Sequence, residues 1–148
     1  MIRFGVLLKW DEINQDLLVD LARKCSNLKY LATMRSEGMQ NEVTQALTNM
    51  VTRIIELSPP LELVNLDEFS INAEQGNQIL CALCVHPTID ETLKEIYLGQ
   101  NPYWWDINNN YGQNNLELLC QLIARCNKLS VIELCGSNLS AAQMSHLL

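Results

Sequence analysis

A short hydrophobic phrase recurs along the chain, and this recurrence constrains the fold more than any other feature of the sequence. Its clearest copy is residues 93–101, which follow the pattern L-x-x-I-x-L-x-x-N. Weaker copies begin at Leu28, Leu61 and Leu129, so successive copies lie 33, 32 and 36 residues apart. Alternating apolar residues are typical of a strand with one buried face, and a near-constant period is typical of repeated strand-containing units.

A second pattern repeats in the segments that precede Leu28 and Leu129. In both segments, apolar residues stand 11, 10, 7 and 3 residues before the leucine that opens the strand phrase. This spacing forms one stripe along a helix, so the chain is predicted to alternate helices with strands. The two matching sets are Leu17, Leu18, Leu21 and Cys25, and Leu118, Leu119, Leu122 and Cys126.

The middle of the chain contains two further predicted helices. Residues 41–57 and 73–85 both carry apolar residues at helical spacing. Pro59 and Pro60 end the first helix, because proline cannot continue a helix and the residue before it avoids the helical region. Residues 88–92 are expected to form a return loop to the next strand.

The outer units are less regular than the middle ones. Residues 102–112 contain Pro, Gly and consecutive Asn, which predict irregular backbone before a helix expected near Asn115. Ser140 and Gln143 have the spacing of a capping box, which predicts the start of a last helix. Residues 2–9 hold an earlier partial copy of the strand phrase, in either of two registers.

The phrase and its helical partners resemble a leucine-rich repeat, and the long period resembles the ribonuclease-inhibitor-like type, in which a full helix follows each strand. The resemblance implies an α/β solenoid with parallel strands lining the concave face and helices on the convex face. It also implies one leucine-rich-repeat domain over residues 1–148. That domain would hold about four and a half repeats, with units starting near residues 28, 61, 93 and 129.

In such an array, the residues between the apolar strand positions point outward from the concave face. These positions combine apolar, aromatic and acidic side chains, and aromatic residues are enriched in recognition surfaces. The alternative is an ordinary solvated face. The hypothesis that this face binds a partner assigns the contact to Tyr30, Met34, Leu63, Asp67, Glu95, Tyr97 and Glu133.

The insertion in the unit that starts near residue 93 contains Tyr103, Trp104 and Trp105. Their rings either fill the gap that the insertion leaves under its own unit or contact a partner as exposed anchors. Burying one aromatic ring removes about 150–250 Å² from water, so at least one tryptophan is expected to be buried. All three residues are kept as candidates for partner contact.

Charge and cysteine usage narrow the class of partner. The chain has 17 acidic and 10 basic residues, a net charge of −7, which argues against nucleic acid because phosphate binding requires a basic surface. Its longest apolar run, residues 79–85, is too short to span a membrane. Six cysteines without a recognisable secretory signal predict reduced thiols in the cytoplasm or another reducing intracellular compartment.

No sequence pattern indicates a catalytic, metal or cofactor site. Cys81 and Cys84 supply only half of a structural zinc site, and no second pair has matching spacing. Cys25 and Cys126 occupy equivalent repeat positions, which predicts small buried residues. His86 and His146 lie outside any nucleophile–base motif and are interpreted as surface or helix-end residues.

The leading hypothesis is a non-enzymatic protein-protein interaction module without cofactor or metal, and its alternative is a structural subunit that braces a larger multiprotein assembly. The C-terminal unit is rich in apolar residues, and an end unit of a repeat array requires a polar outer face or a cover. Self-association or partner binding through this end is therefore also predicted. The apolar residues of this end are Leu139, Met144, Leu147 and Leu148.

Overall fold

The computed structural model describes residues 15–32, 41–68 and 71–148. The described chain begins with α1 (Gln15–Lys24), β1 (Tyr30–Ala32), α2 (Asn41–Glu56), β2 (Leu63–Asn65) and α3 (Ala73–Val85). It continues with α4 (Ile89–Thr92), β3 (Glu95–Tyr97), the 3-10 helix η2 (Pro102–Trp105), α5 (Asn110–Arg125), β4 (Val131–Glu133) and α6 (Ala141–Leu147). The partial copy predicted in residues 2–9 lies outside the described residues.

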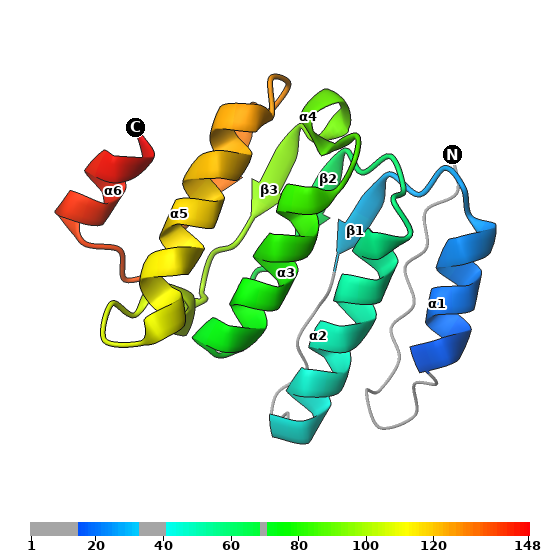
Figure 1. The fold of residues 1–148 in the computed structure, drawn as a ribbon, viewed down its shortest axis with the longest axis horizontal. Coiled ribbons are helices and arrows are strands. Elements are labelled where there is room, and N and C mark those ends of the chain that lie inside the picture. The colour runs from blue at the N-terminus through cyan, green and yellow to red at the C-terminus, as the bar shows by residue number, and fades with distance from the viewer. Residues whose placement is uncertain (1–14, 33–40, 69–70) are drawn as a thin grey trace.

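The four strands form one parallel sheet in the order β1-β2-β3-β4. Their register is constant, because Leu31, Val64, Ile96 and Ile132 are aligned from strand to strand. Figure 1 shows α1, α2, α3, α5 and α6 side by side along one face of this sheet, so the molecule has a helix layer and a strand layer. The predicted α/β class with parallel strands is confirmed.

The core lies between the two layers, where the apolar positions of the strand phrase meet the helical stripes. Leu61 and Leu66 of the second unit and Leu93 and Leu98 of the third are all fully buried. The long crossovers that parallel pairs require contain α2 between β1 and β2, α3 and α4 between β2 and β3, and η2 and α5 between β3 and β4. The buried stripe of α2 consists of Leu47, Met50, Val51, Ile54 and Ile55.

Local sequence accounts for several element boundaries. The α3 helix begins at a capping box, in which the Asn72 side chain accepts from the Gln75 N–H and the Gln75 side chain accepts from the Asn72 N–H. The same reciprocal pair between Ser140 and Gln143 opens α6, as predicted. The asparagine of the strand phrase, Asn101, is buried and donates from Nδ2 to three main-chain carbonyls, which fixes the turn that leaves β3.

The insertion after β3 is partly regular. Its η2 turn packs against α3 and α5, with the Trp104 ring over Gly76, where an added Cβ would lie 2.7 Å from the indole. The buried Asn115 of α5 donates to the carbonyls of Ala73 and Trp104 at 2.8 Å and accepts from Asn77. These contacts hold the insertion on the helix layer.

Two predicted boundaries are wrong. The α5 helix begins at Asn110 rather than near residue 115, because the Asn109 side chain accepts from the Tyr111 N–H and caps the helix earlier. The return segment of residues 88–92 contains the short helix α4, which the apolar pattern could not indicate because only Ile89 of that helix is buried.

Candidate functional site

The outward face of the sheet, opposite the helices, is the surface on which most of the predicted binding residues meet. Because successive strand residues point to opposite faces, burial of Leu31, Val64 and Ile96 places their neighbours on the outward face. The register aligns these neighbours into two rows that cross all four strands. The first row is Tyr30, Leu63, Glu95 and Val131, and the second is Ala32, Asn65, Tyr97 and Glu133.

Tyr97 is the aromatic residue near the middle of this face. Its hydroxyl donates to Glu95 Oε2 at 2.7 Å, so the two side chains of one strand are tied together across the rows. The hydrogen bond to Glu95 raises the pKa of Tyr97, because ionising the phenol would remove the donor and add a second negative charge. The phenol thus stays neutral and its orientation is held before any partner arrives.

Carboxylates follow the strands at the edge where the chain leaves the sheet. Asp67 Oδ1 accepts from the Gly99 N–H at 2.6 Å, and Glu133 Oε1 accepts from the Cys135 N–H at 2.7 Å. Partial burial raises the pKa of Asp67, and repulsion from Glu133 and Glu68 acts in the same direction. These groups are therefore close enough to form a shared negative surface at this edge.

Gly99 makes the approach of Asp67 possible. A Cβ at this position would lie 2.9 Å from the Cys135 carbonyl oxygen and 3.2 Å from Asp67 Oδ1. A side chain here would push the carboxylate away from the main-chain N–H that it accepts from. The glycine is thus required for the geometry of the acidic edge.

At the end of the sheet where the strands begin, two lysines and one glutamate form a charge cluster with a net charge of +1. Glu62 lies between Lys29 and Lys94, at 2.7 Å from each ammonium group. The hydrogen bonds from Lys29 and Lys94 lower the pKa of Glu62 to about 2. These three residues occupy equivalent positions in successive units. Lys, Glu and Lys at equivalent positions could have predicted the cluster from sequence, but the repeat pattern is defined by its apolar positions alone.

The insertion does not add its tryptophans to this surface. Trp104 is fully buried and Trp105 is 2% exposed. The prediction that at least one tryptophan ring is buried is confirmed. The prediction that these two rings contact a partner is wrong for this structure, because the chain itself covers them. The physical reason is the fit of Trp104 over Gly76 and of both rings into the core between α3 and α5. Tyr103 is 63% exposed, but it belongs to η2 on the helix layer.

Thus six of the ten predicted binding residues share the outward face of the sheet: Tyr30, Leu63, Asp67, Glu95, Tyr97 and Glu133. Met34 lies outside the described residues. Sequence reasoning missed Glu62, whose role depends on the lysines of two other units, and Glu68, which adds to the negative charge around Asp67.

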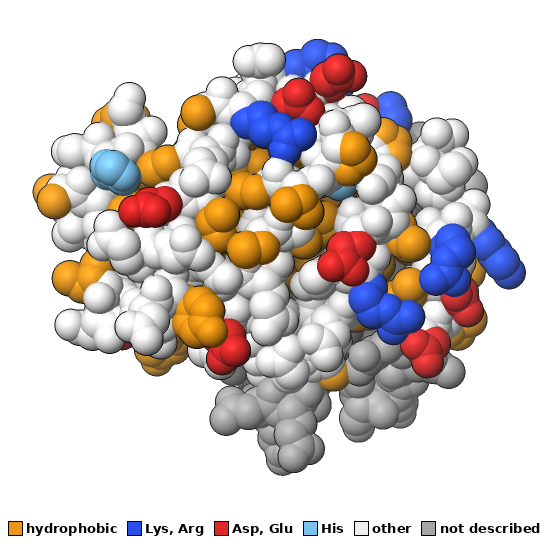
Figure 2. Space-filling model, viewed as in Figure 1, with side chains coloured by type: hydrophobic (Ala, Val, Ile, Leu, Met, Phe, Trp, Pro, Cys, Tyr) orange, Lys and Arg blue, Asp and Glu red, His pale blue; other side chains and the backbone are white. Residues whose placement is uncertain are grey.

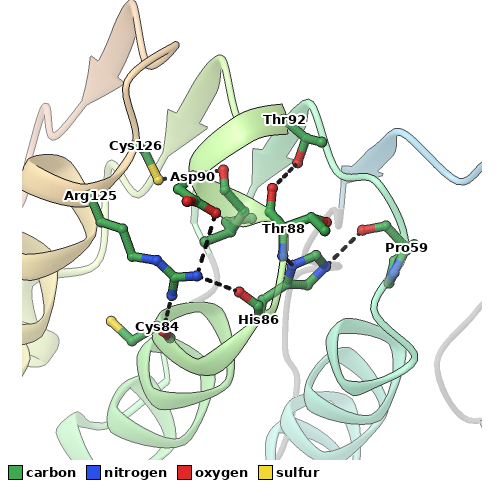
Figure 3. A network of polar contacts seen from close by, with 9 residues as sticks. Pro59, Cys84, His86, Thr88, Asp90, Thr92, Arg125 and Cys126 are labelled. Atoms are coloured by element: carbon green, nitrogen blue, oxygen red, sulfur yellow. Dashed lines mark hydrogen bonds and ion pairs between the residues drawn. The ribbon is translucent and has the colours of Figure 1, made fainter.

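The helix layer carries a separate network around the buried His86, drawn in Figure 3. Arg125 of α5 donates to the carbonyls of Cys84 and His86 at the end of α3 and lies 3.4 Å from Asp90 of α4. His86 Nε2 lies 2.7 Å from the Pro59 carbonyl oxygen, and Nδ1 accepts from the Thr88 N–H. His86 is therefore a neutral imidazole at the end of α3. Its place at a helix end was predicted from sequence, and its burial was not.

Within the described residues, the cysteines belong to no cluster of metal-ligating side chains. All six are unpaired thiols, and burial raises the pKa of Cys84 to about 11, which disfavours the reactive thiolate. Cys126 is buried as expected, whereas Cys25, at the equivalent repeat position, is only partly buried. Among the described residues, no three His, Cys, Asp or Glu side chains are grouped so that they could hold a metal ion.

Comparisons with protein-family models, with curated proteins and with solved structures gave no match to this chain. Within residues 15–32, 41–68 and 71–148, no helix is long and apolar enough to cross a lipid bilayer.

Proposed function

We propose that the chain is a non-enzymatic protein-protein interaction module of leucine-rich-repeat type, similar to the ribonuclease-inhibitor-like group, and that it binds another protein through the outward face of its sheet. Three features support the repeat assignment: the constant parallel register, the helix after each strand, and the buried Asn101 at the end of its strand phrase. The proposed function is inferred from the side chains on the outward face of the sheet, because one fold supports many functions.

The observation that carries the proposal is the composition of the two aligned rows. They place Tyr97, Tyr30 and Leu63 next to carboxylates on a single surface formed by adjacent strands. A buried aromatic residue surrounded by polar groups is the usual composition of a binding hot spot. The hydrogen bond between Tyr97 and Glu95 holds the central ring in place, which lowers the entropy that binding would remove.

Affinity capture with matched variants tests the proposal. The wild-type chain is expected to retain a protein from a lysate of its source organism that is lost with the double variant Tyr30→Ala/Tyr97→Ala. Val85→Ala is the control, because Val85 is 76% exposed on α3, in the helix layer away from the outward face. A protein retained equally by all three chains, or lost only with Val85→Ala, contradicts binding through the sheet.

The alternative function is a structural subunit of a larger multiprotein assembly. It is favoured by exposure at the β4 end, where Ile132 is 39% exposed although the aligned Leu31, Val64 and Ile96 are at most 7% exposed. A free-standing module is expected to be soluble and stable alone, whereas a brace is expected to aggregate without its partners.

A further inference from the structure

The strand β4 forms one edge of the described sheet, and its main chain has unused hydrogen-bonding groups. On the side facing β3, the Val131 N–H donates to Lys94 O, and Glu133 O accepts from the Leu98 N–H. Main-chain groups of successive strand residues point to opposite sides, so the N–H and carbonyl of Ile132 point away from β3. Ser130 O and the Leu134 N–H point the same way, since they are equivalent to Lys94 O and the Leu98 N–H, which pair with the following strand.

The free main-chain groups of β4 can pair with the same groups of a second copy of the chain. A two-fold axis that places Ile132 opposite the same residue of a second copy pairs the N–H and carbonyl of each Ile132 with the other. The same axis brings the Leu134 N–H of each copy to Ser130 O of its neighbour. This is the hydrogen-bonded arrangement of an antiparallel strand pair, and a single rotation satisfies every free group named above.

The side chains at this end are also suited to a second copy. Ile132 is 39% exposed on the helix side of β4, and no residue of α6 is buried; Met144 is 40% exposed. Between residues 129 and 148 the sequence has one carboxylate, Glu133, and no Lys, Arg or Asp, although the whole chain has a net charge of −7. In Figure 2 the end of the molecule where α6 lies shows mainly hydrophobic and uncharged side chains, with a histidine and an acidic side chain beside it and no lysine or arginine.

Two copies can therefore approach through this end with little electrostatic repulsion. Exposed strand edges are commonly protected by lysine, proline or a bulge. The segment from Ser130 to Leu134 contains no lysine or proline.

We propose that the chain forms a two-fold symmetric dimer through the edge of β4, in which two antiparallel β4 strands centred on Ile132 join the sheets of two copies. This interface includes Val131 and Glu133, the β4 members of the two rows, and leaves Tyr30, Leu63 and Tyr97 of the outward face outside it. The partner proposed under the function above is not needed for it to form.

Sedimentation equilibrium of the purified chain, from low to high micromolar concentration, tests the dimer. The wild type is expected to associate to dimers and no further, and Ile132→Lys is expected to raise the dissociation constant by at least about tenfold, because it places a charge in the centre of the interface. Val85→Lys is the control for an added charge at an exposed apolar residue elsewhere. A wild type that stays monomeric throughout the range, or a dimer unaffected by Ile132→Lys, overturns the proposal.

A charge pair at residue 131 tests the register and remains informative if Ile132→Lys fails to fold. In the proposed pairing, Val131 of one copy lies opposite Glu133 of the other, and the dimer contains this pair twice. Val131→Lys is therefore expected to tighten the dimer severalfold and Val131→Glu to weaken it severalfold. Val85→Lys and Val85→Glu correct for the change in net charge. Equal dissociation constants for the two Val131 variants after this correction contradict the pairing.

Discussion

Asn101 is the residue whose side chain does most to fix the path of the main chain. Its Nδ2 donates to the carbonyls of Leu66, Leu98 and Gly99 at 2.9–3.0 Å, and the side chain is fully buried. It thereby links the ends of β2 and β3. In the last unit the equivalent residue is the buried Ser137, whose shorter hydroxyl reaches Leu98 O at 3.4 Å.

Asn101→Ala is expected to lower the free energy of unfolding by about 2–4 kcal/mol, because it leaves buried carbonyls without their donor. Chemical denaturation monitored by circular dichroism measures this change. Asn114→Ala is the matched control: Asn114 is exposed on α5, and its replacement is expected to change stability by less than about 0.5 kcal/mol. Equal losses in the two variants would show that the carbonyl contacts of Asn101 do not stabilise the fold.

Gly76 shows a case in which packing opposes helix propensity. In an exposed helix, replacing glycine by alanine stabilises by about 1 kcal/mol. Here the new Cβ would lie 2.7 Å from the Trp104 ring, so Gly76→Ala is expected to destabilise by about 1–3 kcal/mol.

The loss caused by Gly76→Ala is expected to be smaller in a Trp104→Phe background, because the smaller ring leaves room for the methyl group. Thermal unfolding of the single and double variants measures this coupling. A rise in the melting temperature of Gly76→Ala alone would refute the close contact.

At the scale of elements, the junction of α3, α4 and α5 is held by polar groups as well as by apolar packing. Arg125 donates hydrogen bonds to the carbonyls of Cys84 and His86 at the end of α3 (Figure 3). His86 Nε2 contacts the Pro59 carbonyl oxygen and so links the end of α3 to the segment before β2. Burial lowers the pKa of His86, and the nearby Arg125 lowers it further, while Asp90 and the Pro59 carbonyl oppose this shift.

The lowered pKa of His86 predicts a pH-dependent stability. The unfolded chain takes up a proton on this residue near pH 6.5, whereas the folded chain resists protonation until a lower pH, so the stability contributed by neutral His86 is complete above about pH 6.5 and is lost as the pH falls below it. Denaturant unfolding between about pH 7.5 and 6, above the range of the carboxylates, measures the slope. His86→Gln is expected to reduce this slope; equal slopes in the wild type and His86→Gln would contradict the assignment.

The elements that could be predicted from sequence are those defined by local, periodic patterns. The bounds of α3 and the capping box at Ser140 depend on residues close in the chain. The start of α5 is also set locally, by the Asn109 cap, but Asn109 is one of three consecutive asparagines that could each have capped a helix. The burial of Trp104 could not be predicted in the same way, because it depends on Gly76 and Asn115, which lie in helices that meet only after folding. The Glu62 cluster has the same origin, since its lysines belong to two other units.

At the scale of the whole molecule, the constant register converts a repeated sequence phrase into a continuous surface. Residues about 32 positions apart, such as Leu63 and Glu95, become neighbours on adjacent strands. The helix layer contributes most of the core and the polar junctions, while the outward face of the sheet keeps its aromatic and acidic side chains partly accessible. This division of roles is the basis of the proposed binding function.

The central claim is that the outward face binds a protein partner, and the most direct test is the affinity of the captured partner for single variants, measured by isothermal titration calorimetry. Tyr97→Ala is expected to raise the dissociation constant at least about fivefold, the effect of losing 1 kcal/mol at a hot spot. Val85→Ala on the helix layer is expected to bind as the wild type does. Unchanged affinity in both Tyr97→Ala and Tyr30→Ala, together with weaker binding by Val85→Ala, would contradict the claim and place the binding surface on the helices.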